Sequence, residues 1–422
     1  MVDALPPTLT PAEPTPVSPA AQADALLQQA QASGMRPLLL KGRTLLPVVQ
    51  GGMGVGISGA RLAGTVAGLG AMGVLSALEL RRQYPDLMAQ TDPLPIDDHT
   101  RARIDAANFE ALRREVAKAR ALSGGRGLLA VNIMKAVSAY DAYVRESLAC
   151  GVDAIVVGAG LPLDLPDLAR EHPHTALIPI LSDARGVQLL LRKWEKKGRL
   201  PDAIVIEHPR LAGGHLGAAR VADLGDTRFD FEQVLPAVRE QLRTMGAEGQ
   251  VALIAAGGMQ GPQDVLRMQR LGADAVQMGT AFAVTDECDA HTAFKQVLAG
   301  ARPEDIVEFV SVAGLPARAV RTPWLDKYLR VLPKLQSVAH PKRRCNMGFD
   351  CLAHCGLRDG VADMGQFCID QQLGHAMEGD LQRGLFFRGA GALPFGDRIR
   401  PVSELLRWMV GGALPDAAPT LG

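Results

Sequence analysis

Short, almost entirely apolar runs recur along the chain between stretches with helical periodicity. Segments such as 109–122 and 262–272 place apolar residues at the three- and four-residue spacing of helices that cover a core. Apolar strands that alternate with such helices are typical of a parallel sheet covered by helices. The runs number eight, which predicts an α/β fold of the (β/α)8 TIM-barrel type. They are 46–50, 71–76, 127–133, 154–158, 176–181, 203–207, 251–256 and 275–279.

The barrel is expected to span residues 37–302, with a different segment on either side. Residues 1–36 are rich in proline and lack the basic and continuous apolar parts of a signal peptide, so they predict a flexible arm. Residues 303–422 carry helical patterns and predict a mainly helical C-terminal lobe. Residues 79–107 predict an extended connection that serves as a lid or a dimer contact. An open doubly wound sheet is the alternative fold, but eight units over about 235 residues favour the barrel.

The charge balance and the number of cysteines limit the classes of partner and the cellular location that the sequence predicts. The 45 basic and 45 acidic residues cancel, which indicates neither a nucleic-acid-binding nor a membrane-surface protein. Residues 62–78 carry no charge, but glycines interrupt them and a charged segment follows, so they predict a buried helix and strand rather than a membrane span. Six cysteines are too few for a disulfide framework, so the expected location is cytoplasmic. The expected partner is a small-molecule substrate, with a homodimer left open.

Glycine gathers after the predicted strands, where TIM barrels carry their active sites. Gly257 and Gly258 follow the seventh run, and Gly279 and Thr280 follow the eighth. Such barrels bind phosphate at this place through backbone N–H groups. In the segment "LAGGHLG", His215 stands among three glycines. An imidazole titrates near neutrality and suits proton transfer, although ordinary turn glycines and a loop histidine are the structural alternative.

Four segments in order carry a family resemblance: 47–77, 131–134, 212–217 and 255–282. They resemble the nitronate monooxygenase family, formerly called 2-nitropropane dioxygenases. That family is related to the flavin-dependent enoyl-ACP reductases and shares their FMN-binding barrel. The resemblance therefore implies an FMN-dependent oxidoreductase.

The resemblance also implies roles for individual residues. Glycines and a methionine after the first strand would lie against the flavin ring, an asparagine would contact it, and the glycines of the last two loops would hold the phosphate. His215 would handle a proton. Many relatives have an acidic residue where this chain has Leu211, which leaves the substrate open. The implied cofactor residues are Gly51, Gly52, Met53, Asn132, Gly213, Gly214, Gly257, Gly258, Gln277, Gly279 and Thr280.

A cluster of cysteines sets this chain apart from simple flavin barrels. Cys345, Cys351, Cys355 and Cys368 follow the spacing C-x5-C-x3-C-x12-C. The last two gaps resemble the [4Fe-4S] segment of 2,4-dienoyl-CoA reductases, which also use an FMN barrel, and four thiolates suit one cluster. Zinc and unliganded buried thiols are the alternatives.

Three functions are compatible with these features. The favoured one is oxidation of alkyl nitronates with O2, which needs no nicotinamide. The second is an NAD(P)H-dependent reductase of enoyl thioesters or quinones, in which an iron–sulfur cluster relays electrons. The third is a non-catalytic subunit that binds flavin or a cluster in a larger complex.

Overall fold

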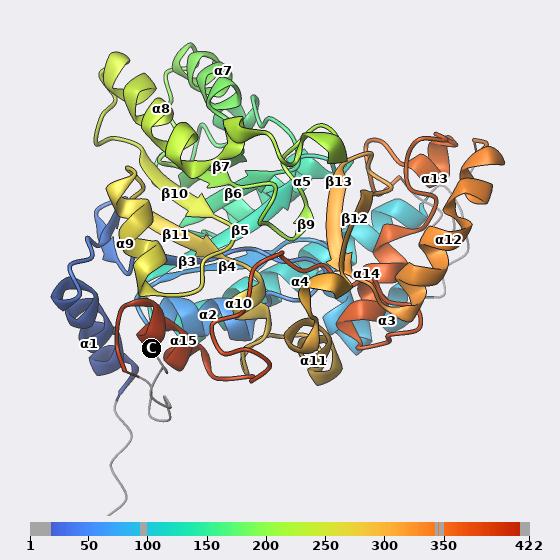
Figure 1. Cartoon of the computed structure of the whole chain (residues 1–422), viewed down its shortest axis with the longest axis horizontal. Helices are drawn as coiled ribbons and strands as arrows, with labels where there is room; N and C mark the ends of the chain where they lie inside the picture. Colours follow the sequence, from blue (N-terminus) through green and yellow to red (C-terminus); the bar gives the residue numbers. More distant parts are fainter. Residues whose placement is uncertain (1–17, 93–98, 342–344, 346–349, 414–422) are drawn as a thin grey trace, which may run out of the picture.

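Eight parallel strands close into a barrel in the computed structural model, which describes residues 18–92, 99–341, 345 and 350–413 (Figure 1). The strands follow one another around the barrel in chain order, apart from β9, which lies outside it. Each coincides with a predicted apolar run to within two residues at either end, which confirms the predicted fold. They are β3 (Val48–Gln50), β4 (Met72–Ser76), β5 (Leu128–Met134), β6 (Ala154–Gly158), β7 (Ala176–Leu181), β8 (Ala203–Glu207), β10 (Ala252–Ala256) and β11 (Ala275–Met278).

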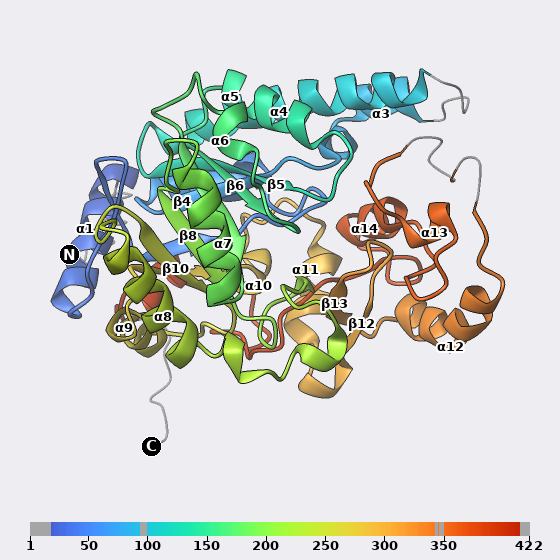
Figure 2. The same ribbon diagram turned by 90° about the horizontal axis from the view of Figure 1, so that it is seen from above.

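Helices surround this barrel (Figures 1 and 2). The uncharged segment 62–78 is a buried helix followed by strand β4, as its composition predicts. Helix α2 packs closely enough on β4 that a Cβ atom added to Gly73 would lie 1.9 Å from the carbonyl oxygen of Ala63. The helices are α2 (Ala60–Gly68), α3 (Pro85–Thr91), α4 (Thr100–Ser123), α5 (Tyr140–Ala149), α6 (Leu165–Leu168), α7 (Ala184–Glu195), α8 (Phe231–Thr244), α9 (Pro262–Arg270), α10 (Thr280–Ala283) and α11 (Thr292–Gly300).

Alternate residues of each strand belong to two separate cores. In β8, Ala203 and Val205 pack with their counterparts inside the barrel, whereas Ile204 and Ile206 pack against the surrounding helices. This period of two is the geometry of a strand, whose successive side chains point to opposite faces. The next position that faces the inside of the barrel is therefore Glu207, at the carboxyl end.

The segment before the first barrel strand is ordered, so the prediction of a flexible arm is wrong for residues 18–36. Helix α1 (Pro19–Ala32) begins at Ser18, whose hydroxyl accepts an N–H group, and it buries Leu26 and Ala30 against the barrel helices. A hairpin of β1 (Leu38–Leu40) and β2 (Arg43–Leu45) then inserts Leu38, Leu40 and Leu45 into the inner core at the amino end of the strands. Residues 1–17 lie outside the described residues.

The C-terminal region is less helical and less separate than the sequence predicts. Strands β12 (Ile306–Val310) and β13 (Pro316–Val320) pair with each other, and β13 also pairs with β9 (Gly214–His215) from the barrel loop. Helix α15 then returns to the barrel, where it contacts α2, α9 and α10. The helices of this region are α12 (Pro323–Ser337), α13 (Gly356–Asp359), α14 (Ile369–Met377) and α15 (Val402–Met409).

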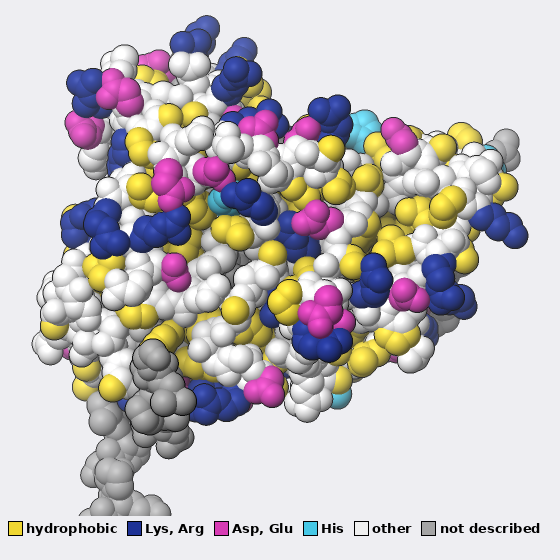
Figure 3. Space-filling view, viewed as in Figure 1, with side chains coloured by type: hydrophobic (Ala, Val, Ile, Leu, Met, Phe, Trp, Pro, Cys, Tyr) yellow, Lys and Arg dark blue, Asp and Glu magenta, His cyan; other side chains and the backbone are white. Residues whose placement is uncertain are grey.

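The connection predicted as a lid or a dimer contact contains a 3-10 turn at Leu80–Gln83, helix α3 and the start of α4. Its residues 93–98 lie outside the described residues, and either role stays a prediction. In the described part of the chain, no helix is both long and apolar enough to cross a membrane. Acidic and basic side chains are interspersed over the face in Figure 3, in keeping with the zero net charge.

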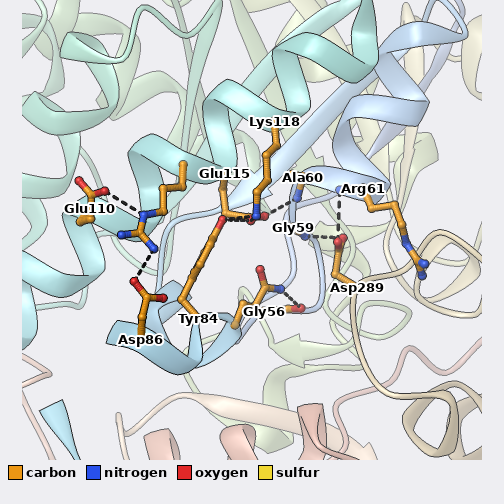
Figure 4. A network of polar contacts seen from close by, with 12 residues as sticks. Gly56, Gly59, Ala60, Arg61, Tyr84, Asp86, Glu110, Glu115, Lys118 and Asp289 are labelled. Carbon is orange, nitrogen blue, oxygen red and sulfur yellow. Dashed lines mark hydrogen bonds and ion pairs between the residues drawn. The ribbon is translucent and has the colours of Figure 1, made fainter. Parts of the chain in front are cut away.

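Two carboxylates from distant elements, the buried Glu115 and the half-buried Asp289, bind the amino end of α2 (Figure 4). Asp289 accepts the N–H group of Gly59 at 2.9 Å and that of Arg61 at 3.2 Å. Glu115 on α4 accepts the N–H group of Ala60 at 2.5 Å. A helix start leaves N–H groups without intrahelical partners, and these carboxylates satisfy them. They thereby fix the glycine-rich loop that joins β3 to α2.

We expect Asp289→Ala to lower the free energy of unfolding by about 2 kcal/mol, because it leaves several N–H groups of a buried helix start without acceptors. Urea denaturation monitored by circular dichroism measures the change. Glu240→Ala is the control, since it removes an exposed pair with Arg243 on the surface of α8 and should leave the midpoint nearly unchanged. Equal midpoints for the two variants would contradict the capping role.

Candidate active site

A cavity of about 350 Å³ lies at the carboxyl ends of the barrel strands. Cofactor sites commonly measure roughly 300–1,000 Å³, and this end of a TIM barrel is where active sites are built. His215 and every residue that the sequence assigns to the cofactor line this one cavity. Those cofactor residues are Gly51, Gly52, Met53, Asn132, Gly213, Gly214, Gly257, Gly258, Gln277, Gly279 and Thr280.

The floor of the cavity is the last layer of residues that face the inside of the barrel. Four residues near the carboxyl ends of their strands continue the inner alternation and line the cavity: Ser76, Asn132, Glu207 and Gln277. The sequence analysis identified Asn132 and Gln277 but missed Ser76 and Glu207 as cavity residues. The period of two along β4 and β8 is the signal that finds both.

Glu207 provides a carboxyl group on this floor. Burial raises its pKa to about 7, and Arg318 partly opposes the shift. The carboxyl group is thus protonated in a large share of molecules at neutral pH and can donate a hydrogen bond. At Leu211, where many relatives carry an acid, the side chain instead packs over Gly258, whose added Cβ would lie 3.0 Å from it.

Glycines bring the backbone close to other groups around the cavity. A Cβ atom added to Gly52 would lie 2.4 Å from that of Asn132, and one added to Gly213 would lie 2.4 Å from the carbonyl carbon of Arg388. Gly257 and Gly258 have φ angles of +112° and +74°, in the region that favours glycine. Side chains at these positions would clash or strain the backbone, so the chain leaves room for a ligand.

His215 lies on β9 with its ring against Phe387, at a centroid distance of 5.5 Å. Its Nε2 atom is buried and has no hydrogen-bond partner. Burial lowers the pKa of the imidazole to about 4, so His215 is neutral at pH 7. A neutral imidazole can accept a proton at one nitrogen and donate a hydrogen bond from the other.

The cavity fits the FMN that the resemblance implies. His215 Nε2 and Gln277 Oε1 are buried polar atoms without partners, and such atoms usually have one in a functional protein. The glycine loops leave their N–H groups uncovered, as a phosphate requires. The residues present would therefore hold the flavin ring between the floor and His215, and the phosphate at the glycine loops after β10 and β11.

The cysteine segment borders the same cavity. Cys351 lines it, and hydrogen bonds between backbone groups, including Ser138 N–H to Cys351 O at 3.1 Å, hold the segment against the loop after β5. Cys355 and Cys368 occupy the cap positions of α13 and α14. Burial raises the pKa of the Cys351 thiol, and the nearby Asp370 raises it further, followed by Cys368, Cys355 and Cys345.

Those four cysteines do not form a ligand set in this structure. Among the described residues, no three His, Cys, Asp or Glu side chains are placed to hold a metal ion. The predicted metal site at Cys345, Cys351, Cys355 and Cys368 therefore gains no support from the geometry. We derive no chemical step through a cluster.

Comparison with known proteins assigns the family. The profile of the family described as "Nitronate monooxygenase" matches residues 37–412. The chain belongs to this family. It is accordingly a flavin-dependent oxidoreductase, as the sequence motifs imply.

Individual relatives are distant. The chain is 28% identical over 291 residues to a probable nitronate monooxygenase of Bacillus subtilis, covering 67% of this chain and 78% of that protein. It is 32% identical to the nitronate monooxygenase of Pseudomonas aeruginosa over 119 residues, covering only 28% of this chain and 31% of the relative.

Solved structures share the fold. FabK from Thermotoga maritima has a TM-score of 0.58 at 22% identity, covering 86% of this chain and 91% of its own. A nitroalkane oxidase from Streptomyces ansochromogenes has a TM-score of 0.57 at 20% identity, covering 86% and 94%. At these identities the likeness concerns the fold and leaves the substrate open.

Proposed function

We propose that this chain binds FMN in the cavity and oxidises alkyl nitronates with O2. The observation that carries the proposal is His215, a neutral imidazole whose buried Nε2 lacks a partner at the cavity wall. A nitronate is the anion of a nitroalkane and accepts hydrogen bonds through its oxygens. Family membership makes nitronates the first substrates to test.

The chain's own residues would position the reactants and move a proton. Bound FMN supplies the electron transfer between the nitronate and O2, which no side chain of the cavity can supply. His215 donates a hydrogen bond to a nitronate oxygen in one tautomer and accepts a proton in the other. The apolar wall that includes Phe387 and Met53 excludes water and strengthens these contacts.

One observation favours a second candidate, an NAD(P)H-dependent reductase of enoyl thioesters or quinones. Cys351 lines the cavity and three further cysteines lie near it. A nitronate oxidase has no evident need for such a group. Burial of His215 disfavours the charged imidazole in either reaction, so the pKa of this residue does not decide between the two candidates.

Anaerobic mixing of the flavin-loaded protein with separate reductants distinguishes the two candidates. We expect an alkyl nitronate to bleach the flavin absorbance, and NADH and NADPH to leave it unchanged on the same timescale. Admission of air should then restore the oxidised spectrum. Bleaching by NAD(P)H alone would overturn the proposal in favour of the reductase.

His215→Ala should lower kcat/KM for the nitronate by about 10²- to 10⁴-fold, the usual size of a proton-transfer or hydrogen-bonding contribution, while FMN remains bound. Steady-state oxygen consumption measures the loss, and the flavin spectrum confirms loading. His340→Ala, which changes an exposed histidine with a hydrogen bond to Val338, is the control. Wild-type turnover in His215→Ala would remove this residue from the mechanism.

Metal analysis of protein purified without oxygen tests the cysteine segment. If it binds a [4Fe-4S] cluster, we expect about four iron atoms per chain, and Cys351→Ser should abolish them. Cys150→Ser, at the C-terminal cap of α5 and outside the four-cysteine segment, should retain them. About one zinc atom per chain would indicate a zinc site instead, and neither metal would leave the thiols as packing groups.

A further inference from the structure

Three arginines have almost fully buried side chains in the described part of the chain: Arg81, Arg318 and Arg388. Arg81 pairs with Glu79, and Arg318 pairs with Glu308. Arg388 has no carboxylate within ion-pair distance among the described residues, although only 4% of its surface is exposed. A buried charge without a counter-charge is costly, so the functional protein is expected to supply an anion.

The contacts of Arg388 show that its position is fixed. Its guanidinium donates to the carbonyl oxygen of Leu298 at 2.9 Å, and to those of Gly389 and Gly391 at 2.7 and 3.1 Å. These neutral acceptors satisfy the donors without cancelling the charge. Burial accordingly lowers the pKa of this guanidinium, with no carboxylate to oppose the shift.

Arg388 lines the cavity, and the segment after it lies beside the loops predicted to hold phosphate. The N–H group of Gly389 donates to Thr280 Oγ1 at 3.0 Å. A Cβ atom added to Gly391 would lie 3.4 Å from the Cα atom of Gly258. The uncompensated charge is thus placed at the phosphate end of the proposed flavin site.

We propose that Arg388 is a positioning residue that supplies the counter-charge for the FMN phosphate and orients residues 388–391 around it. This inference rests on the proposed binding of FMN. The resemblance assigns the phosphate to neutral backbone and hydroxyl groups, whereas the structure adds a buried cation from a segment more than 100 residues further along the chain. The guanidinium binds two carbonyl groups of its own loop and thereby fixes the course of residues 388–391 beside Thr280 and Gly258.

The test compares FMN with riboflavin, which lacks only the phosphate, on full-length protein stripped of flavin. Quenching of flavin fluorescence gives both dissociation constants. We expect Arg388→Met to weaken FMN binding by about 10- to 100-fold, as for the loss of a charge-assisted hydrogen bond, and to leave riboflavin binding within about threefold. Arg321→Met, a change of a nearby exposed arginine, should alter neither constant.

Equal weakening of both flavins in Arg388→Met, or of neither, would overturn the inference. Failure of the wild-type chain to bind either flavin would instead overturn the proposed function. If Arg388→Met does not fold, Arg388→Lys is measured in its place. That variant keeps the charge, so it should retain a preference for FMN over riboflavin. Loss of this preference, with riboflavin binding intact, would show that the planar guanidinium is needed as well as the charge.

Inorganic phosphate provides a second readout that needs no flavin. It should raise the melting temperature of the stripped wild-type protein above that in chloride of equal ionic strength, because a ligand that binds only the folded state stabilises it. The rise should be absent in Arg388→Met. An equal rise in both proteins would contradict the role of Arg388.

Discussion

The narrow interior of the closed barrel constrains everything above it. Eight strands leave an interior just wide enough to be filled by layers of side chains. Alanine, valine and isoleucine fill the lower layers here, as Ala203 and Val205 do on β8. The uppermost layer contains polar and small residues, and it remains open as the floor of the cavity. The register of each strand therefore determines which side chains reach the cavity. A shift of one residue along β8 would turn Glu207 out of the cavity and Ile206 into it.

The walls of the cavity depend on contacts between segments far apart in the chain. Strand β9, which carries His215, is only two residues long and is held by pairing with β13. The backbone at Arg388 packs so closely against Gly213 that only glycine fits there. The C-terminal region thus completes the site rather than forming a separate lobe. Carboxylates at the start of α2 fix the opposite wall in the same way.

The barrel could be predicted because its strands are local apolar runs, and the glycine motifs fall directly after them. The C-terminal sheet could not be predicted, since β9 has no apolar run and its partner β13 lies about 100 residues away. Helix α1 was missed because an alanine- and glutamine-rich segment after many prolines shows a weak apolar face. Its stability comes from packing on the barrel helices, a tertiary effect that local propensity does not include.

The residues of the candidate site likewise divide into those that the sequence predicts and those that only the fold brings into the cavity. The positions of Asn132 and Gln277 in the cavity follow from motifs, and Glu207 could have been found from the alternation along β8. Arg388 could not have been found from the sequence, because a sequence does not show whether an arginine is exposed or buried. Its burial and its lack of a carboxylate partner emerge only when the chain has folded.

The charges around the cavity suit anions at both ends of a bound flavin. In the proposed flavin site, Arg388 would leave the phosphate end positive, since its guanidinium has no carboxylate partner among the described residues. Near the ring, His215 is neutral and burial favours the protonated form of Glu207. Both groups can therefore donate hydrogen bonds without adding negative charge. In a site of low dielectric constant, such donors stabilise added negative charge more strongly than they would in water. For the proposed function, these donors would favour an anionic substrate beside a flavin that gains electrons, which ionised carboxylates at these positions would oppose.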